Sequence, residues 1–407
     1  MYTQSEVLDF IEEEDVKFIR LAFFDLKGKQ KNISIMPSEL NRAFENGIPF
    51  DASAIEGFEG PQESELYLKP DPSTLAIIPW RPATGKVVRM FCNILTPDGK
   101  PYLKDSRTIL QNACQRLKDE CGIEMMIGTE VEFYLFKLDE NGQPTSETFD
   151  KAGYMDIAPE DHGENIRREI CFTLEQMGIT PEASHHEEGP GQNEIDFHYS
   201  DALTAADNVA TFKWIVNTKA AANGLYADFS PKPIAGQAGN GMHINVSYRP
   251  ANGKEKNTED LLPYILGGIL KHIEEITYFL NSADNSYNRL GASKAPEYIS
   301  WGKENRSTLI RVPSSTSTKR LELRSPDPLC NTYLVLTLLI EAAIEGIKNK
   351  IQPPAETTEN LFDDEVAKKT SLKALPKSLA EAKRIAENSE FVKRVLGAVV
   401  TPVATTR

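Results

Sequence analysis

Apolar residues recur along the chain with two spacings, which predict where helices and strands lie. Between 106 and 122 the helical spacing gives a stripe of Ile109, Leu110, Ala113 and Leu117. We expect this helix to begin at Ser106 as its N-cap and to end at Gly122. Further helices are expected over 163–177, 205–222, 262–281, 332–349 and 379–388.

Alternation of apolar and polar residues, the second spacing, predicts strands. In the run 123–136, Glu130 and Glu132 leave one face while Val131 and Phe133 leave the other. Further strands are expected over 16–24, 31–36, 182–188, 194–199, 242–248, 309–312 and 320–324.

The expected elements divide the chain into two regions. Up to about residue 100, short strands alternate with turns, and the turn-like stretch 96–101 is the expected domain boundary. Beyond it helices and strands alternate. The pattern therefore predicts a strand-rich domain over 1–101 followed by an α/β catalytic region over 102–407.

Composition narrows the class of protein. The chain has 407 residues, of which 40% are apolar and 8% aromatic, as in ordinary globular proteins. Its net charge of −15 argues against a general nucleic-acid binder, whose surface would be basic. No apolar run approaches the roughly 18 residues that span a bilayer, so we expect no membrane partner. The N-terminus lacks a signal core and the 5 cysteines lack metal-like spacing, so we expect reduced thiols in a cytoplasmic protein.

Acidic residues and a histidine indicate metal chemistry. Glu130 and Glu132 on one strand face repel each other and are costly to desolvate, and a divalent cation between them removes both costs. A glycine-rich loop over 232–247 has Lys232 at its edge and delivers His243. Such loops suit close approach of the backbone to phosphates. Metal, phosphate and carboxylates together indicate nucleotide-dependent chemistry.

These motifs, in this order, resemble those of type I glutamine synthetases, and in particular a Gram-positive-like subgroup. The resemblance runs from about Phe50 to Asn349. It rests on the segments Phe50–Ser53, His185–Glu187, Gly191–Glu194, Asn305–Arg311 and Arg320–Asp327. It implies an α+β fold. A small β-grasp-like N-terminal domain, 1–101, would precede a large catalytic domain, 102–407, of curved antiparallel sheet with flanking helices.

Enzymes of this family bind ATP and two or three Mg²⁺ or Mn²⁺ ions. By resemblance, the first metal would be held by Glu132, Glu187 and Glu194. The second metal would be held by Glu130, His243 and Glu322. A donor set of carboxylates and one imidazole, with no thiolate, suits Mg²⁺ or Mn²⁺ better than zinc.

The resemblance also implies substrate sites. Arg324 would bind the α-carboxylate of glutamate, with Gly239 nearby, and Arg289 would bind the γ-carboxylate. Asp51 would reach in from a neighbouring subunit and bind ammonium. The expected catalytic residues are Asp51, Arg289 and Arg306. The expected nucleotide-binding residues are Glu182, His185, Ser247, Arg306, Arg311 and Arg320.

Several positions depart from the family pattern at the amino-acid end of the site. Lys294 stands where the family usually has a glutamate that takes a proton from ammonium, and a lysine there would repel ammonium. Glu297 lies just beyond and is a candidate replacement. Ala238 replaces an asparagine that contacts glutamate, and Asn245 replaces a histidine of the nucleotide loop.

Other departures concern regulation and assembly. Gly60 stands where some relatives carry an arginine linked to feedback inhibition. Phe362 has no hydroxyl and stands near where other relatives carry an adenylylated tyrosine, so we expect that control to be absent. The chain ends at Arg407, before the C-terminal strap that joins two rings in relatives, so weaker ring stacking is expected.

The leading hypothesis is an ATP-dependent ligase that makes glutamine from glutamate and ammonia through γ-glutamyl phosphate. A second is a glutamate–amine ligase using an organic amine, because Lys294 and Ala238 lie where the nucleophile would bind. A third, of another class, is a weakly active or inactive nucleotide-binding ring with a regulatory role. We expect a homo-oligomer, ring-shaped, with active sites between subunits.

Overall fold

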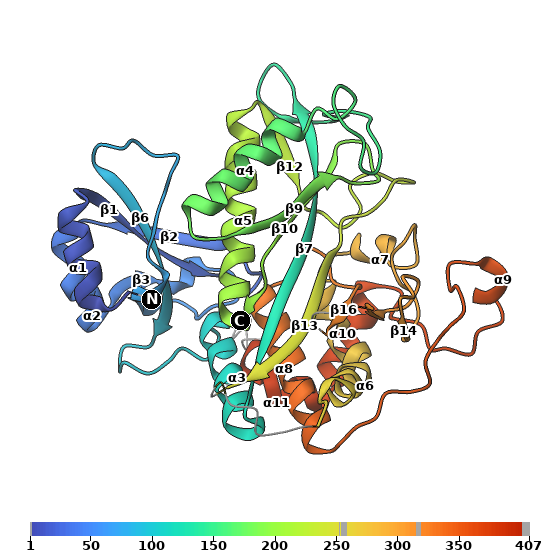
Figure 1. Cartoon of the computed structure of the whole chain (residues 1–407). Coiled ribbons are helices and arrows are strands. Elements are labelled where there is room, and N and C mark those ends of the chain that lie inside the picture. The colour runs from blue at the N-terminus through green and yellow to red at the C-terminus, as the bar shows by residue number, and fades with distance from the viewer. Residues whose placement is uncertain (1, 252, 254–258, 315–318, 401–407) are drawn as a thin grey trace.

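The computed structural model describes residues 2–251, 253, 259–314 and 319–400, and it has two parts of unequal size (Figure 1). The smaller, N-terminal part holds a 6-stranded sheet of order β2-β1-β6-β4-β3, with β5 paired to β6. Strands β1 and β6 run parallel. The elements are α1 (Gln4–Glu13), β1 (Val16–Phe24), β2 (Gln30–Ile35), α2 (Leu40–Asn46), β3 (Ile48–Asp51), β4 (Glu65–Pro70), β5 (Ala76–Ile77) and β6 (Lys86–Leu95).

Helices α1 and α2 were not expected from the sequence pattern, which predicted only strands and turns here. A capping box starts α1: the Glu6 carboxylate accepts the N–H of Thr3 at 2.7 Å, and the Thr3 hydroxyl accepts that of Glu6 at 3.3 Å. Each helix buries only two or three side chains, too few to give a clear period. The buried side chains are Val7, Ile11, Leu40, Ala43 and Phe44.

The larger part is built on a 10-stranded sheet with the long β7 near its centre (Figure 1). The order is β14-β15-β16-β13-β7-β10-β9, and β8, β11 and β12 also pair with β7. Strands β14 and β15 run parallel, so the sheet is mixed rather than wholly antiparallel. The strands are β7 (Ile123–Leu138), β8 (Pro144–Thr148), β9 (Pro181–His186), β10 (Gln192–Phe197), β11 (Ser200–Asp201), β12 (Leu225–Asp228), β13 (Met242–Pro250), β14 (Trp301–Lys303), β15 (Ile310–Val312) and β16 (Leu321–Leu323).

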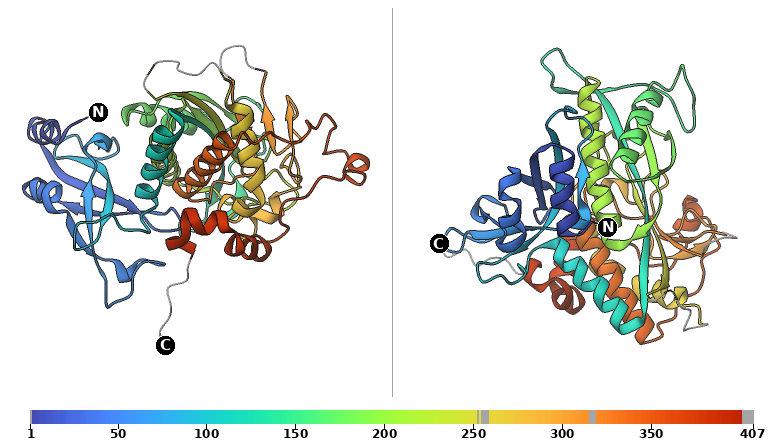
Figure 2. Two further views of the ribbon diagram at one scale, coloured as in Figure 1. Left: turned by 90° about the horizontal axis from the view of Figure 1, so that it is seen from below. Right: turned by 60° about the vertical axis from the view of Figure 1, so that its left-hand side comes forward.

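Helices pack on this sheet and on one another, and α3, α8 and α6 lie side by side (Figure 2). Helix α8 is buried over most of its length, as expected for an apolar core helix. Within the described ranges, no helix is both long enough and apolar enough to cross a bilayer. The helices are α3 (Ser106–Cys121), α4 (Glu164–Gln176), α5 (Ala202–Ala222), α6 (Leu262–Leu280), α7 (Ser286–Arg289), α8 (Thr332–Lys348), α9 (Asp364–Ala367), α10 (Leu379–Asn388) and α11 (Glu390–Val400).

Beyond residue 101 each predicted helix and strand lies close to an observed one, but β8, β11, β12, β14, α7, α9 and α11 were not predicted. One expected cap is wrong. The side chain of Asp105, and not that of Ser106, accepts the N–H of Arg107 at 3.2 Å and so caps α3. Ser106 is the first helical residue, and its buried hydroxyl has no hydrogen-bond partner among the described residues.

A buried ionic network joins the two parts of the chain. Arg107 donates to Asp207 of α5 at 3.1 and 2.9 Å, and to Asp71 of the N-terminal part at 2.9 Å. The hydroxyl of Tyr333 in α8 also donates to Asp207, at 2.6 Å. Loss of one partner would leave a buried charge uncompensated, which is strongly destabilising. The network therefore joins the N-terminal part to helices α3, α5 and α8 of the larger part.

Candidate active site

The acidic face of β7 meets polar side chains of the neighbouring strands in matching register. Glu132 lies opposite Glu194 of β10, and Glu130 lies opposite His243 of β13. Because strand side chains alternate, all of these emerge on one side of the sheet, while Val131 is wholly buried on the other. The sheet thereby gathers carboxylates and an imidazole from distant parts of the chain.

These side chains line a cavity of about 500 Å³. Its lining includes every expected metal ligand and most of the expected substrate and nucleotide residues. The expected residues that line it are Glu130, Glu132, Glu187, Glu194, His243, Glu322, His185, Gly239, Arg289, Arg306, Arg311, Arg320 and Arg324. Glu182 and Ser247 instead line an adjoining cavity of about 380 Å³, which shares Glu130, Asp196 and Arg320 with the first. Asp51 lines neither cavity and is exposed on the N-terminal part.

One ligand set is tightly gathered. A ligand atom from each of Glu130, His243 and Glu322 lies within 4.8 Å of the others. His243 Nδ1 is 3.1 Å from Glu130 and 3.7 Å from Glu322. Burial opposes ionisation of Glu130, but the hydrogen bond and charge of His243 prevail and lower its pKa to about 2. Asn245 adds a hydrogen bond of 2.8 Å to Glu130.

Glu322, 2% exposed, is held by two arginines. Arg311 donates to it at 2.6 Å and Arg324 at 3.2 Å. Both pairs are charge-assisted hydrogen bonds in a buried setting, so they fix the position of the carboxylate. Its remaining lone pairs are available to a cation beside His243.

The other expected ligand set, Glu132, Glu187 and Glu194, lines the same cavity, but among the described residues it is not one of the groups whose ligand atoms all lie within 4.8 Å of one another. His185 Nε2 lies 3.5 Å from Glu194, and His185 Nδ1 lies 3.8 Å from Glu187. Glu132 accepts the N–H of Gly241 at 2.7 Å. Burial and the charge of Glu194 raise the pKa of Glu132 to about 8. Facing, buried carboxylates with raised pKa values fit a divalent cation, which replaces the proton that one of them would otherwise need.

Asp196 belongs to the site but was not expected from the sequence. It lies two residues beyond Glu194 on β10, and atoms of His185, Glu194 and Asp196 lie within 4.8 Å of one another. Burial and the charge of Glu130 raise the pKa of Asp196 to about 7. The signal was present, because Glu194-x-Asp196 repeats the alternation of Glu130-x-Glu132. Other unexpected polar lining residues are Tyr154, Glu188 and Gln192.

Glycines let the loop over 236–243 approach Arg289, a buried arginine that lines the cavity. A Cβ at Gly239 would lie 2.4 Å from the carbonyl oxygen of Pro231, and one at Gly241 would lie 2.6 Å from a terminal nitrogen of Arg289. Only glycine fits such approaches. Lys232, which precedes this loop, donates to the carbonyl of Gln237 and does not line the cavity.

Arg289, 3% exposed, has its terminal nitrogens bonded to the main chain. They donate to the carbonyls of Ser325 at 2.7 Å and Arg324 at 3.1 Å. Burial lowers the pKa of Arg289. In this arrangement Arg289 places a positive charge at the side of the cavity, but its two terminal nitrogens already donate to the main chain.

Lys294 is not a free cation at the cavity mouth. Its Nζ forms an ion pair with Glu188, and both side chains line the cavity. Glu297, the candidate replacement base, is paired with Lys377 instead and does not line the cavity. Glu188 is therefore the carboxylate closest to Lys294 among the described lining residues.

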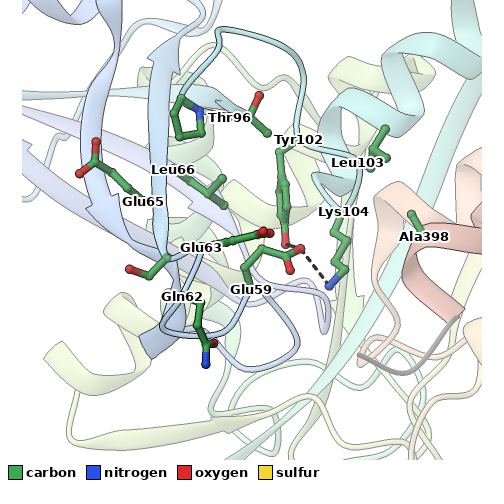
Figure 3. Close-up of a pocket in the computed structure, with 12 residues that line it drawn as sticks. Glu59, Gln62, Glu63, Glu65, Leu66, Thr96, Tyr102, Leu103, Lys104 and Ala398 are labelled. Atoms are coloured by element: carbon green, nitrogen blue, oxygen red, sulfur yellow. Dashed lines mark hydrogen bonds and ion pairs between the residues drawn. The ribbon is translucent and has the colours of Figure 1, made fainter. Parts of the chain in front are cut away.

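A second, larger cavity of about 850 Å³ lies between the N-terminal part and Ala398 of α11, and Figure 3 shows its lining. Glu59, Tyr102 and Lys104 point toward one another there: Tyr102 donates to Glu59 at 3.0 Å, and Lys104 pairs with it at 3.2 Å. The lining contains no histidine, cysteine or arginine. It lacks the convergent donor set of the smaller cavity, which is the candidate for chemistry.

Divalent cations are expected to stabilise the protein more at about pH 8 than at about pH 5.5. In the metal-free protein the raised pKa values of Glu132 and Asp196, about 8 and about 7, favour the folded state while these groups are protonated. That contribution is complete below their unfolded pKa values of about 4 and is lost as the pH rises through 7 to 8. A cation then takes the place of the missing protons.

The measurement is the increase in Tm on adding Mg²⁺, by calorimetry, at both pH values. We expect a larger increase at the higher pH. An increase that shrinks as the pH rises would show that these carboxylates do not hold the cation.

Over nearly its whole length the chain is similar to proteins of one family. The family models for the glutamine synthetase β-grasp domain and catalytic domain match residues 15–97 and 103–402. Glutamine synthetases of Methanosarcina mazei and Clostridium saccharobutylicum are 46% and 45% identical, covering 97% of this chain and 91% and 92% of theirs. A solved complex of GmaS with ADP has a TM-score of 0.87 and 28% identity, covering 97% of this chain and 92% of that one. The cryo-EM structure of Plasmodium falciparum glutamine synthetase has a TM-score of 0.84 and 25% identity, covering 98% and 95%.

Proposed function

The chain belongs to the glutamine synthetase family, and we propose that it joins ammonia to the γ-carboxylate of glutamate at the expense of ATP. The observation that carries this proposal is the cavity in which Glu130, His243 and Glu322 converge beside several arginines. Arginines that line the cavity, together with clustered oxygen ligands, suit a site that binds phosphates and a dicarboxylic amino acid.

The proposed reaction has two steps. A carboxylate is a poor electrophile because its leaving group would be oxide. An oxygen of the γ-carboxylate therefore attacks the γ-phosphorus of ATP, the bond to the bridging oxygen breaks, and ADP leaves. Ammonia then attacks the carbonyl carbon of the acyl phosphate, loses a proton, and expels inorganic phosphate. The phosphate carries away one oxygen that began in glutamate.

Side chains of this chain bind and orient the reactants in this proposal. Arg324 holds the α-carboxylate of glutamate, near the backbone of Gly239, and the buried charge of Arg289 attracts the γ-carboxylate. Arg306 stabilises charge on the transferring phosphoryl group. The nucleotide-facing residues are Glu182, His185, Ser247, Arg311 and Arg320.

We propose that the cavity binds two or three Mg²⁺ or Mn²⁺ ions, and we assign ligands to two of these positions. Divalent ions supply charge neutralisation on the phosphates when bound. The first position is formed by Glu132, Glu187 and Glu194. The second is formed by Glu130, His243 and Glu322.

We also propose that the site is completed by a second copy of the chain in a ring. Asp51 is exposed and does not line the cavity within one chain. Its carboxylate accepts hydrogen bonds from the N–H of Ser53 at 2.9 Å and its hydroxyl at 2.6 Å, and it also has a hydrogen bond with the side chain of Ser64. In this proposal the exposed carboxylate of Asp51 binds ammonium at the cavity of a neighbouring copy.

An organic amine is the second candidate nucleophile, and the cavity lining supports it. Ala238, Ala292 and Ala295 line the same cavity as Lys294, so small apolar side chains leave room for an alkyl group at that end. The test is release of phosphate from ATP with glutamate and a panel of ammonia, methylamine and larger amines, with the product identified by mass. Fastest turnover with ammonia supports glutamine synthesis, and fastest turnover with an alkylamine supports the second candidate. No turnover with any of them would favour a nucleotide-binding protein without ligase activity.

Replacing Lys294 by glutamate is expected to lower the KM for ammonium by about tenfold, or about 1.4 kcal/mol. The change removes a cation from the mouth and places a second carboxylate beside Glu188. At an effective dielectric of about 20, the attraction between an ammonium ion and one carboxylate charge 4 Å away is about 4 kcal/mol. Solvent reduces this attraction because position 294 is largely exposed.

Lys377→Glu is the matched control, since Lys377 is another exposed lysine paired with a glutamate, outside the cavity. Its KM for ammonium should stay native. Vigorous native glutamine synthesis that is lost in Lys294→Glu would show that the lysine itself assists the reaction.

A further inference from the structure

Two consecutive histidines at the end of β9 face opposite ways. His185 lines the cavity, whereas His186 is 0% exposed and points to the other side of the sheet. His186 therefore cannot touch a substrate. It must act, if at all, through the residues that surround it.

Both ring nitrogens of His186 meet oxygen acceptors. Nε2 is 2.9 Å from Asp150 Oδ1, and Nδ1 is 2.7 Å from the carbonyl oxygen of Glu187. Glu187 is one of the proposed metal ligands. The ring thus connects a buried carboxylate to the backbone of a ligand residue.

Asp150, 5% exposed, also holds the far end of the same turn. Its Oδ1 accepts the N–H of Gly191 at 2.9 Å, and its Oδ2 accepts the N–H of His162 at 3.1 Å. The turn from Glu187 to Gly191 is therefore tied at both ends to one carboxylate. Gly191 has a φ of 70°, and a Cβ there would lie 2.9 Å from a carbonyl oxygen of β7, so the turn has little freedom to shift.

A metal ion is not needed to explain the buried acidic cluster behind the turn. Ligand atoms of Asp150, Asp161 and His186 do lie within 4.8 Å of one another. Asp161, however, is paired with Arg167 through contacts of 2.5 and 3.2 Å. Asp150 and His186 are engaged as described above. Hydrogen-bond donors thus already occupy the positions that a cation would take.

From these contacts we propose that Asp150 and His186 are positioning residues that lock the Glu187–Gly191 turn and so present Glu187 to the metal-binding cavity. The inference rests on the proposed function, because it gives Glu187 a role as ligand. Groups that orient ligand residues in this way typically affect metal affinity by about ten- to a hundredfold.

The test is the affinity for Mn²⁺ of the full-length protein without substrates, by calorimetry, in the native chain and in Asp150→Asn. An asparagine has one acceptor oxygen and one NH₂ group. In either orientation the NH₂ group therefore faces a backbone N–H, of Gly191 or of His162, that now donates to Asp150. We expect Mn²⁺ binding to weaken by about tenfold or more, and kcat to fall with little change in the KM for glutamate.

Asp105→Asn is the matched control. Asp105 is a buried carboxylate, 1% exposed, that accepts the N–H groups of Ile94 and Arg107 far from the cavity. It should lose stability while keeping native Mn²⁺ affinity. A folded Asp150→Asn protein with native Mn²⁺ affinity would overturn the proposal.

His186→Asn carries the same test if Asp150→Asn does not fold, because its amide can still donate toward the carbonyl of Glu187. His186→Asn should bind Mn²⁺ more weakly than the native protein and more tightly than His186→Ala. If His186→Asn and His186→Ala both bind Mn²⁺ with the affinity of the native protein, the proposal is overturned. Failure of the native protein itself to bind Mn²⁺ would instead contradict the proposed function.

Discussion

Replacing Glu322 by glutamine is expected to lower glutamine synthesis by about a thousandfold while the protein stays folded. Glu322 lies between His243, at 3.7 Å, and the guanidinium groups of Arg311 and Arg324. A neutral amide removes one charged ligand from the tightly gathered set. Loss of several kcal/mol of charge stabilisation in the transition state corresponds to a factor of this size.

Glutamine is a better probe here than alanine. Alanine would leave the buried Arg324 and the half-buried Arg311 without their carboxylate, at a cost of about 3 to 5 kcal/mol in stability, and would confuse loss of fold with loss of chemistry. The glutamine side chain keeps the volume and still accepts one hydrogen bond. Turnover is measured as phosphate release at saturating ATP and glutamate, and folding by circular dichroism.

Glu341→Gln controls for the general effect of neutralising a buried glutamate. Glu341 is 4% exposed and pairs with Arg116 at 2.6 Å and Arg394 at 3.4 Å, outside the cavity. It should lose stability and keep its turnover. Native turnover in Glu322→Gln would remove Glu322 from the catalytic site.

Two inactive variants are expected to restore activity when they assemble together. Asp51→Ala lacks the residue proposed to enter a neighbouring cavity, and Glu322→Gln lacks a ligand within the cavity. If each site takes Asp51 from one copy and Glu322 from another, random mixing at equal amounts leaves both residues native in roughly a quarter of the sites. Activity of the co-expressed mixture, against each variant alone, measures this fraction.

Asp71→Ala serves as the control for the local role of Asp51. Asp71 accepts the N–H of Ser73 at 3.0 Å and its hydroxyl at 2.6 Å, in the same kind of turn that Asp51 makes with Ser53. It also pairs with Arg107, so its stability loss should be at least as large. Full activity of folded Asp71→Ala is expected. A mixture no more active than its two components would argue that each chain holds a complete site.

The catalytic face of β7 was predictable because it depends on alternation alone. Glu130 and Glu132 share a face, as predicted, and the motifs that resemble the family led to the other residues that line the cavity. Long helices such as α3 and α8 were predictable because each carries a sustained apolar stripe or run. The assigned roles of the lining residues stay predictions until they are tested.

The features that could not be predicted depend on tertiary contacts. The helices α1 and α2 are short and are held by packing on a sheet whose order does not follow from the sequence. The partner of Lys294 is Glu188, which is 106 positions away along the chain. The carboxylate of Asp150 meets His186 only because the end of β9 lies next to the segment that follows β8. Contacts at such separations leave no periodic pattern.

Transfer of oxygen from glutamate to phosphate tests the central claim most directly. The protein is incubated with ATP, ammonia and glutamate labelled with ¹⁸O in its γ-carboxylate, and the products are analysed by mass spectrometry. The proposed reaction predicts glutamine together with inorganic phosphate that carries one ¹⁸O atom, since the acyl phosphate breaks between its carbonyl carbon and that oxygen. Phosphate released without ¹⁸O, or ATP consumed without glutamine, would contradict it.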